Sequence, residues 1–166
     1  TYNGDHMSMY GVNGSIPKTL VQALVRWAAE NRFDDVKDIL LDIIDTPISP
    51  ELLPADANDQ IQQVTEDLVG PYELHDFFIY HFVRYGFAPE KIYLMATTAF
   101  NGRYDNATIK KWLTTFIRRF FTQQFKRSAM PDGAQVTCCA LDPQSGWIMT
   151  SDTSYAVWMQ NCESIE

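Results

Sequence analysis

Apolar residues recur every three to four positions along most of this chain, the spacing that places them on one face of an α-helix. The pattern predicts five helices, at residues 17–30, 34–46, 70–86, 89–100 and 105–126. Pro17 and Pro89 suit the first turn of a helix, and Gly86 suits a C-terminal cap. Asp34 can cap the second helix, and either Asp105 or Asn106 the fifth.

The same spacing identifies the side chains that we expect in the core. The predicted stripes are Leu20, Val21, Leu24, Val25 and Ala28; Val36, Ile39, Leu40 and Ile43; Leu74, Phe77, Phe78, Tyr80, Phe82 and Val83; Ile92, Tyr93, Met95 and Phe100; and Trp112, Leu113, Phe116, Ile117, Phe120 and Phe121. Each stripe follows a helical period, so we expect one buried face for each helix.

Two stretches break the helical pattern. Residues 55–67 are mostly small, polar or acidic, which predicts a surface loop. Beyond Gly133, the short extended runs 135–141 and 147–150 flank a turn-prone segment and predict a two-stranded ribbon. The expected fold class is mainly α, with about five helices and a short C-terminal β ribbon. The alternating strand and helix pattern of a nucleotide-binding sheet is absent.

Composition narrows the class of protein. The 166 residues, 46% of them hydrophobic, suffice for one domain with a packed core. A formal charge of -8 argues against a general nucleic-acid binder. Three cysteines without a CxxC pair favour a reduced, cytoplasmic setting, and no apolar run is long enough to span a membrane. The start at Thr1 rather than Met suggests a processed product or an excised piece.

Cations gather between residues 110 and 127, where six of the thirteen Lys and Arg residues lie. For Lys110 and Lys111 a solvated helix face is the expected role. Lys126 and Arg127 differ because they stand just before the Pro131–Gly133 loop, where they could complement the carbonyl end of the helix or grip a phosphate or carboxylate. The sequence leaves these two roles open.

No constellation of side chains by itself indicates a complete active site. His75 and Asp76 are adjacent on a helix and point in different directions, so we expect structural or interface roles for them. The three histidines have no metal-binding spacing, and the chain has neither a P-loop nor a nucleophile elbow. We therefore assign no catalytic residue and no metal ligand.

Three separated blocks nevertheless resemble a known family. They are TYNGDHMSMYGVNGSIPKTL at 1–20, GPYELHDFFIYHF at 70–82 and FKRSAMPDG at 125–133. Together they are similar to the C-terminal part of the synthetase domain of bacterial glutamine-dependent NAD+ synthetases. The resemblance implies that residues 1–166 are one segment of a larger α/β domain of the adenine nucleotide alpha hydrolase-like type.

The resemblance also implies a reaction and its site residues. The family's enzymes adenylate deamido-NAD with ATP and Mg²⁺, then form NAD+ with ammonia that a separate nitrilase-like glutaminase domain releases from glutamine. The residues implied to bind deamido-NAD are Thr1, Tyr2, Asp5 and Lys126, and those implied near ATP are Lys18 and Ser49.

The resemblance places other parts of the enzyme outside this segment. The phosphate loop of the synthetase and the glutaminase domain are missing from the chain, and the acidic residue that holds Mg²⁺ is expected upstream of Thr1. We therefore expect the isolated segment to be inactive and to bind no cofactor tightly. Expected partners are deamido-NAD, ATP, the glutaminase domain and further copies of the protein, with no nucleic acid and no membrane.

Two functions of other classes remain open at this point. The chain could be an independent helical interaction module that binds a partner through its Phe-rich helices. Alternatively, its basic helix could bind nucleic acid, which predicts a steep dependence on salt.

Overall fold

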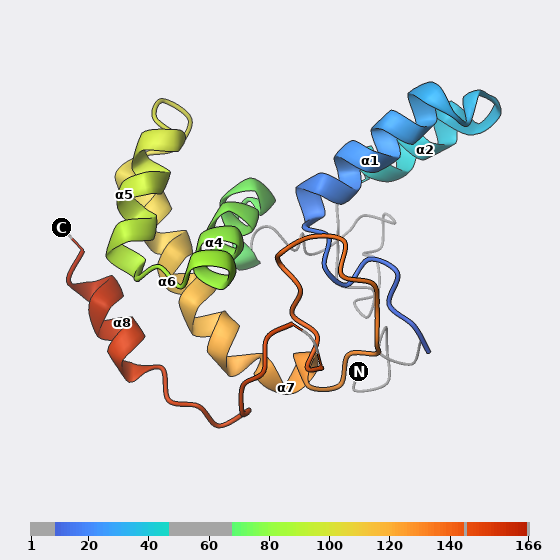
Figure 1. The fold of residues 1–166 in the computed structure, drawn as a ribbon. Helices are drawn as coiled ribbons and strands as arrows, with labels where there is room; N and C mark the ends of the chain where they lie inside the picture. Colours follow the sequence, from blue (N-terminus) through green and yellow to red (C-terminus); the bar gives the residue numbers. More distant parts are fainter. Residues whose placement is uncertain (1–8, 47–67, 145, 166) are drawn as a thin grey trace, which may run out of the picture. The chain divides into compact units, whose positions relative to one another are not determined.

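The computed structural model describes residues 9–46, 68–144 and 146–165, and in them the chain is mostly helical (Figure 1). The elements are α1 (Lys18–Asn31), the 3₁₀ helix η2 (Asp34–Val36), α2 (Lys37–Asp45), α4 (Tyr72–Tyr85), α5 (Pro89–Ala99), α6 (Asn106–Thr122), α7 (Gln124–Arg127) and α8 (Ala156–Glu163). The mainly helical class is confirmed. The predicted loop at 55–67 lies outside the described residues.

The chain divides into two compact units. The larger unit comprises Thr1–Ile16 and Leu74–Glu166, and the second, here called the hairpin unit, comprises Pro17–Glu73. In the larger unit α6 packs against both α5 and α8, and α5 also contacts α8. In the hairpin unit the main contact is between α1 and α2.

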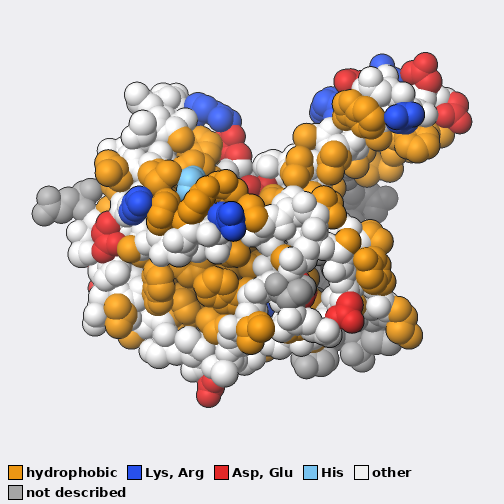
Figure 2. Space-filling view, viewed as in Figure 1, with side chains coloured by type: hydrophobic (Ala, Val, Ile, Leu, Met, Phe, Trp, Pro, Cys, Tyr) orange, Lys and Arg blue, Asp and Glu red, His pale blue; other side chains and the backbone are white. Residues whose placement is uncertain are grey.

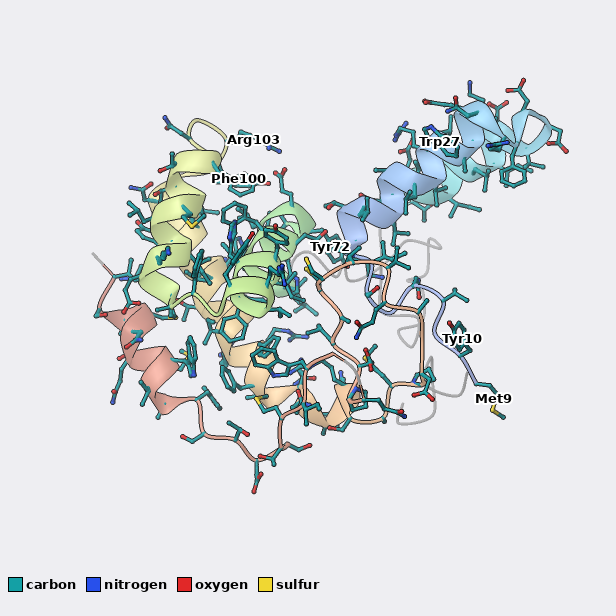
Figure 3. The ribbon with its side chains drawn as sticks, viewed as in Figure 1. Met9, Tyr10, Trp27, Tyr72, Phe100 and Arg103 are labelled. Atoms are coloured by element: carbon teal, nitrogen blue, oxygen red, sulfur yellow. The ribbon has the colours of Figure 1, made fainter. Side chains whose placement is uncertain are left out.

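A single aromatic-rich core holds the larger unit together. Its buried members are Leu74, Phe78, Phe82, Ile92, Ala96, Phe100, Ile109, Leu113, Phe116, Ile117, Phe120, Phe121, Cys162 and Ile165. The rings meet mostly edge to face, the arrangement that the charge distribution of aromatic rings favours. At the rim of this core the guanidinium of Arg103 lies 5.5 Å from the ring centre of Phe100 (Figure 3).

The helix-end signals of the larger unit are confirmed. Gly86 has φ of 63° and donates its N–H to the carbonyl of Phe82 at 2.9 Å, as a C-terminal cap does. Asp105, rather than Asn106, is the N-cap of α6, because its carboxylate accepts the N–H of Thr108 at 2.6 Å.

The hairpin unit departs from the predicted burial pattern. Ile39 and Ile43, two members of the α2 stripe, are 61% and 60% exposed, and Leu20 and Leu24 of α1 are also exposed. Figure 2 shows hydrophobic side chains at the surface of this unit. Two paired helices can bury only the faces that meet, so the other apolar side chains of α1 and α2 are left uncovered by the described residues of this unit.

The start of α2 also differs from the prediction. Asp34 does not cap this helix. It is the first residue of η2, whose N-cap is Phe33, and α2 begins only at Lys37, with no side-chain cap. The spacing correctly indicated a helix, but a tighter 3₁₀ turn precedes it, and Val36, Ile39 and Ile43 of the predicted stripe are exposed.

The predicted fifth helix, 105–126, is two helices. Its backbone leaves helical geometry at Gln123, with φ of -100° and ψ of 13°, and resumes in the single turn of α7. The buried stripe of α6 is confirmed except for Trp112, which is half-buried.

The predicted C-terminal ribbon is not confirmed. No strand occurs in residues 135–144 or 146–150, and the one β-bridge in the described chain joins Gly11 to Gly133. Trp147 and Met149 pack against the helical core while Ile148 is 79% exposed. The alternation that suggested a strand therefore reflects an extended segment lying on helices, without a partner strand.

Helix α8 was not predicted, and it changes the interpretation of Lys110. Trp158, Met159 and Cys162 of α8 join the core, and the ammonium of Lys110 donates a hydrogen bond to the carbonyl of Ile165 just beyond this helix. The solvated role expected for Lys110 is therefore wrong. Lys111 is exposed, with its ammonium 4.3 Å from the ring centre of Trp112.

Candidate functional site

Of the six predicted site residues, the structure describes Lys18 and Lys126. Lys126 belongs to the larger unit and Lys18 to the hairpin unit, so the structure fixes no distance between them. Thr1, Tyr2, Asp5 and Ser49 lie outside the described residues. The candidate site is therefore built from Lys126 and the loop that follows it.

Lys126 projects from α7, one residue before the helix ends at Arg127. Its side chain is exposed, and its ammonium lies 6.0 Å from the ring centre of Phe125, at the outer limit for a cation–π contact. Within the described part of the chain no hydrogen bond or ion pair engages this ammonium. Its charge is thus available to an anion.

Arg127, the next residue, is engaged by its own protein. Its Nη2 donates to the carbonyl of Phe120 and, at 2.7 Å, to Gln124 Oε1, while Nε donates to the same oxygen at 3.1 Å. The guanidinium also lies over the Phe120 ring, 4.3 Å from its centre. Burial lowers the pKa of Arg127 to about 10, so the group remains charged at neutral pH.

The loop after α7 is joined to the segment that precedes α1. The hydroxyl of Ser15, which is buried, accepts the N–H groups of Val136 at 2.7 Å and Thr137 at 3.2 Å. It donates to the carbonyl of Ala134 at 3.2 Å, and the Thr137 hydroxyl donates to the Ser15 carbonyl. The Ser15 hydroxyl thereby hydrogen-bonds three backbone groups that lie 119 to 122 residues away along the chain.

Glycine makes the second attachment between these segments. The Gly11 N–H donates to the Asp132 carbonyl at 2.6 Å, and Gly11 pairs with Gly133 in a parallel bridge. A Cβ at Gly133 would overlap the Gly11 carbonyl oxygen, so only glycine permits this approach. The segment that contains Gly11 and Ser15 is thus held beside the loop that follows Lys126.

We expect Ser15→Ala to open this attachment. Removal of the hydroxyl leaves the N–H groups of Val136 and Thr137 without their acceptor, and a hydrogen bond of this kind contributes about 0.5–1.5 kcal/mol. Amide hydrogen exchange at these two residues should accelerate at least about tenfold, which corresponds to about 1.4 kcal/mol of lost protection. Ser154→Ala is the control, because Ser154 is exposed. Unchanged exchange at both amides would contradict the role given to Ser15.

Lys18, the proposed ATP contact, is the first residue of α1, and its side chain is exposed. Pro17 precedes it and no side chain caps this helix end. Helix N-termini carry unpaired N–H groups and partial positive charge, so a lysine here adds to a field that already favours anions.

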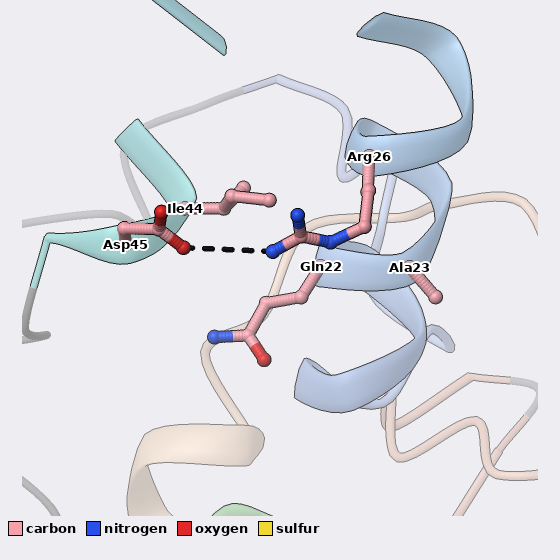
Figure 4. A pocket seen from close by; sticks show the side chains of 5 residues that line it. All are labelled: Gln22, Ala23, Arg26, Ile44 and Asp45. Carbon is pink, nitrogen blue, oxygen red and sulfur yellow. Dashed lines mark hydrogen bonds and ion pairs between the residues drawn. The ribbon is translucent and has the colours of Figure 1, made fainter. Parts of the chain in front are cut away.

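A separate hollow of about 700 Å³ lies between α1 and α2 (Figure 4). It is lined by Gln22, Ala23, Arg26, Ile44 and Asp45. The charged pair inside it, Arg26 and Asp45, is 3.5 Å apart and more than half exposed on both sides. Neither Lys18 nor Lys126 lines this hollow, so it is not part of the candidate site.

His75 and His81 lie in α4 and have structural surroundings. The ring of His75 meets Phe116 edge to face at 5.2 Å, and burial is the main cause that lowers its pKa, with Asp76 opposing and Arg119 adding to the shift. Burial also lowers the pKa of His81, whose Nδ1 is buried without a partner among the described residues. The structural role expected for His75 agrees with these contacts.

These depressed pKa values predict a loss of stability in mild acid. Below the ordinary pKa of 6.5 the unfolded chain takes up protons that the folded histidines resist, so the free energy of unfolding should fall as pH is lowered from 7.5 to about 5.5. The His75→Phe variant retains an aromatic ring against Phe116 and should lose part of this slope. Urea midpoints at the two pH values test this. An unchanged slope in the variant would refute the assignment to His75.

Metal-binding and thiol chemistry receive no support from the described residues. No group of three His, Cys, Asp or Glu side chains among them is placed to hold a metal ion. The three cysteines are free thiols, and burial raises the pKa of both Cys139 and Cys162 to about 11. These two thiols are therefore poor nucleophiles at neutral pH.

The sequence did not indicate two of the residues that shape this site. Gln124 is 1% exposed and binds both Arg127 and the carbonyl of Met149, yet its position in a polar pair, Gln123-Gln124, suggested no burial. Ser15 lay inside a quoted motif but had no role. A buried hydrogen-bonded glutamine has no periodic signature, so only the fold reveals it.

The geometry defines a mostly helical segment in which an available lysine follows a long amphipathic helix and precedes an anchored loop. None of the described helices is long and apolar enough to cross a membrane. No protein-family model matches the chain.

Individual relatives do match. The chain is 38% identical over 180 residues to the glutamine-dependent NAD(+) synthetase of Mycobacterium leprae (strain TN), and equally to that of Mycobacterium tuberculosis (strain ATCC 25618 / H37Rv). Each alignment covers 96% of this chain and 26% of the relative. The chain therefore spans about a quarter of the length of these curated relatives.

A solved structure supports the fold. The chain superposes on the crystal structure of a glutamine-dependent NAD(+) synthetase from Cytophaga hutchinsonii with a TM-score of 0.70 at 17% identity, covering 98% of this chain and 23% of that one. The chain is thus related to one segment of the glutamine-dependent NAD(+) synthetases, which confirms the resemblance found in the sequence. An unrelated helical interaction module is not favoured.

Proposed function

We propose that residues 1–166 form the C-terminal segment of the synthetase domain in a larger glutamine-dependent NAD+ synthetase. In the full-length protein this domain is of the α/β, adenine nucleotide alpha hydrolase-like type. The whole enzyme is an ATP-dependent carbon–nitrogen ligase that adenylates deamido-NAD and replaces AMP with ammonia derived from glutamine. The present segment supplies one wall of the substrate pocket and is inactive by itself.

The observation that carries this proposal is the state of Lys126. In a chain with a formal charge of -8, it offers an exposed ammonium that no described carboxylate neutralises, within a motif found to resemble the family's substrate contact. Deamido-NAD carries a pyrophosphate and a nicotinate carboxylate, and a lysine ammonium binds such oxygens by charge-assisted hydrogen bonds. The anchored loop after α7 keeps this surface in one conformation.

The remaining contacts complete the proposed pocket. Thr1 and Tyr2 lie along the nicotinate end of deamido-NAD, where a tyrosine ring can stack on the heteroaromatic ring. Asp5 is a further hydrogen-bonding residue for this substrate. Lys18 binds an ATP phosphate at the start of α1, and Ser49 lies near ATP.

Magnesium has no binding site among the described residues, which lack a suitable ligand cluster. We therefore derive no step that involves Mg²⁺ from this segment, and we place its ligands elsewhere in the full-length protein. What the residues of this chain contribute is binding and charge neutralisation, which lower the barrier to a reaction between two anionic substrates.

The proposed partners are the glutaminase domain of the same protein and further copies of it, in the cytoplasm. Self-association is supported by the hairpin unit, where large apolar side chains such as Trp27, Ile39 and Ile43 are exposed. Contiguous exposed apolar surface on a soluble protein is commonly a contact surface.

A direct assay tests the proposed function. The full-length protein that contains this chain is incubated with deamido-NAD, ATP, Mg²⁺ and either glutamine or ammonia, and NAD+ and AMP are quantified by chromatography. We expect equal amounts of NAD+ and AMP with either nitrogen source. Absence of NAD+ formation with both sources, in a correctly folded protein, would refute the proposal.

A further inference from the structure

The short helix α7 cannot maintain its conformation by its own hydrogen bonds. It has four residues, Gln124–Arg127, and isolated helices of this length are unstable in water. Its orientation must therefore come from contacts with other parts of the unit. Since Lys126 is one of its four residues, the same contacts decide where the Lys126 ammonium points.

The buried Gln124 and the half-buried Arg127 provide these contacts. Arg127 reaches back to the carbonyl of Phe120 in α6 and stacks on the Phe120 ring. Gln124 donates from Nε2 to the carbonyl of Met149 at 3.1 Å and accepts twice from Arg127. The chain of contacts Phe120–Arg127–Gln124–Met149 therefore ties α7 to α6 on one side and to the 147–150 segment on the other.

The neighbours Lys126 and Arg127 thus divide between two roles. The guanidinium of Arg127 uses three of its five N–H donors inside the protein, whereas the ammonium of Lys126 has no hydrogen-bond partner among the described residues. No described carboxylate pairs with Arg127 either. Its acceptors are neutral, so its positive charge persists beside Lys126.

We propose that Arg127 is a positioning residue for Lys126: with Gln124 it fixes α7 so that the lysine ammonium meets an anionic group of deamido-NAD. This inference rests on the proposed function and deepens it. The guanidinium does this through its planar fork, which binds Phe120 and Gln124 at once. A lysine ammonium at the same place could keep the charge but could not reproduce both bonds with the ring contact.

The test compares three variants of the full-length protein by steady-state kinetics. Arg127→Lys keeps the positive charge but removes the planar guanidinium that bonds the Phe120 carbonyl and Gln124 together. Gln124→Met removes the acceptor of Arg127 at a position that is 1% exposed and so cannot touch a substrate. Gln124→Glu keeps the acceptor of both Arg127 bonds but removes the donor to the Met149 carbonyl, so it tests the Arg127 contact separately from the tie to the 147–150 segment.

We expect Arg127→Lys and Gln124→Met each to raise the KM for deamido-NAD by about tenfold, because a small displacement of a binding group costs about this much or more. Gln124→Glu should stay within about threefold of wild type, and the KM for ATP should change by less than about twofold in all three. Partial misfolding would lower the active concentration without this selective rise in one KM. Near-UV circular dichroism of each variant confirms the fold.

Three results would count against the inference in different ways. A rise in KM with Arg127→Lys but not with Gln124→Met would show that Arg127 contacts the substrate directly. An unchanged KM in both variants would show that the fork does not position Lys126. Failure of the wild-type protein to convert deamido-NAD would overturn the proposed function, and this inference with it.

Discussion

Replacing Lys126 with Met should reduce kcat/KM for deamido-NAD by about 100-fold in the full-length protein, the largest effect that we expect from a single exposed residue. A hydrogen bond to a charged group contributes about 1.5–3 kcal/mol, and about 1.4 kcal/mol corresponds to a tenfold change. Met preserves the length and apolar stem of Lys126, so the loss reports on the charge. The rate of NAD+ formation at subsaturating deamido-NAD measures it.

Lys111→Met is the matched control for this experiment. Lys111 is also an exposed lysine, located on α6, with its ammonium near the ring of Trp112. The same change of charge there should leave kcat/KM within about twofold of wild type, because a surface charge outside the pocket contributes little. Equal losses in both variants would mean that the overall charge matters and that Lys126 has no special place.

The distinction between Lys126 and Arg127 shows what sequence alone could and could not establish about the site. The position of both cations at the end of the basic helix left open whether they complement helix carbonyls or bind a ligand, and the family resemblance implied a substrate contact for Lys126. The structure distinguishes their surroundings, because Arg127 donates to the carbonyl of Phe120 while Lys126 stays exposed. Which of two adjacent side chains points inward depends on the break at Gln123, and nothing periodic marks that break.

The fold was predictable where local signals and burial agree. In α4, α5 and α6 the end signals and the apolar spacing indicate the same helices, and the structure places most of each predicted stripe in one core. The exceptions are Tyr80, which is 38% exposed, and Met95, which does not join the core. In α2 the helix was recognised from its apolar spacing, yet Ile39 is exposed because none of the described residues of this unit covers it. In the 147–150 segment Trp147 and Met149 are packed and Ile148 is exposed, as alternation predicts, but these side chains pack against helices and not within a sheet.

A sequence shows which residues prefer burial and not what buries them. Helix α8 shows the converse: the spacing of its residues did not indicate a helix, yet it is helical and packs Trp158 against the helical core. In both cases, contacts with residues distant in the sequence determine the conformation and the burial of the segment. The same holds for Ser15, whose role depends on a turn near Val136 that no local pattern could connect to it.

Phe82 should be the residue on which the stability of the larger unit depends most. Its side chain is 1% exposed, and its ring lies within 4.8–6.3 Å, centre to centre, of five other aromatic rings. These rings belong to Phe116, Phe120, Phe121, Trp147 and Trp158. Phe82 thus joins α4 to α6, to α8 and to the 147–150 segment.

We expect Phe82→Ala to lower the free energy of unfolding by about 3–5 kcal/mol, because the cavity left among rigid rings cannot collapse. Urea unfolding of the 166-residue chain, followed by near-UV circular dichroism, measures the change. Phe125→Ala removes the same side chain from a site that is 44% exposed and should cost about 1 kcal/mol or less. If the two variants were equally stable, the aromatic cluster would not be the cooperative core of this unit. A large loss confined to Phe82→Ala would identify the aromatic cluster, which also contains the Phe120 ring under Arg127, as the cooperative core of this unit.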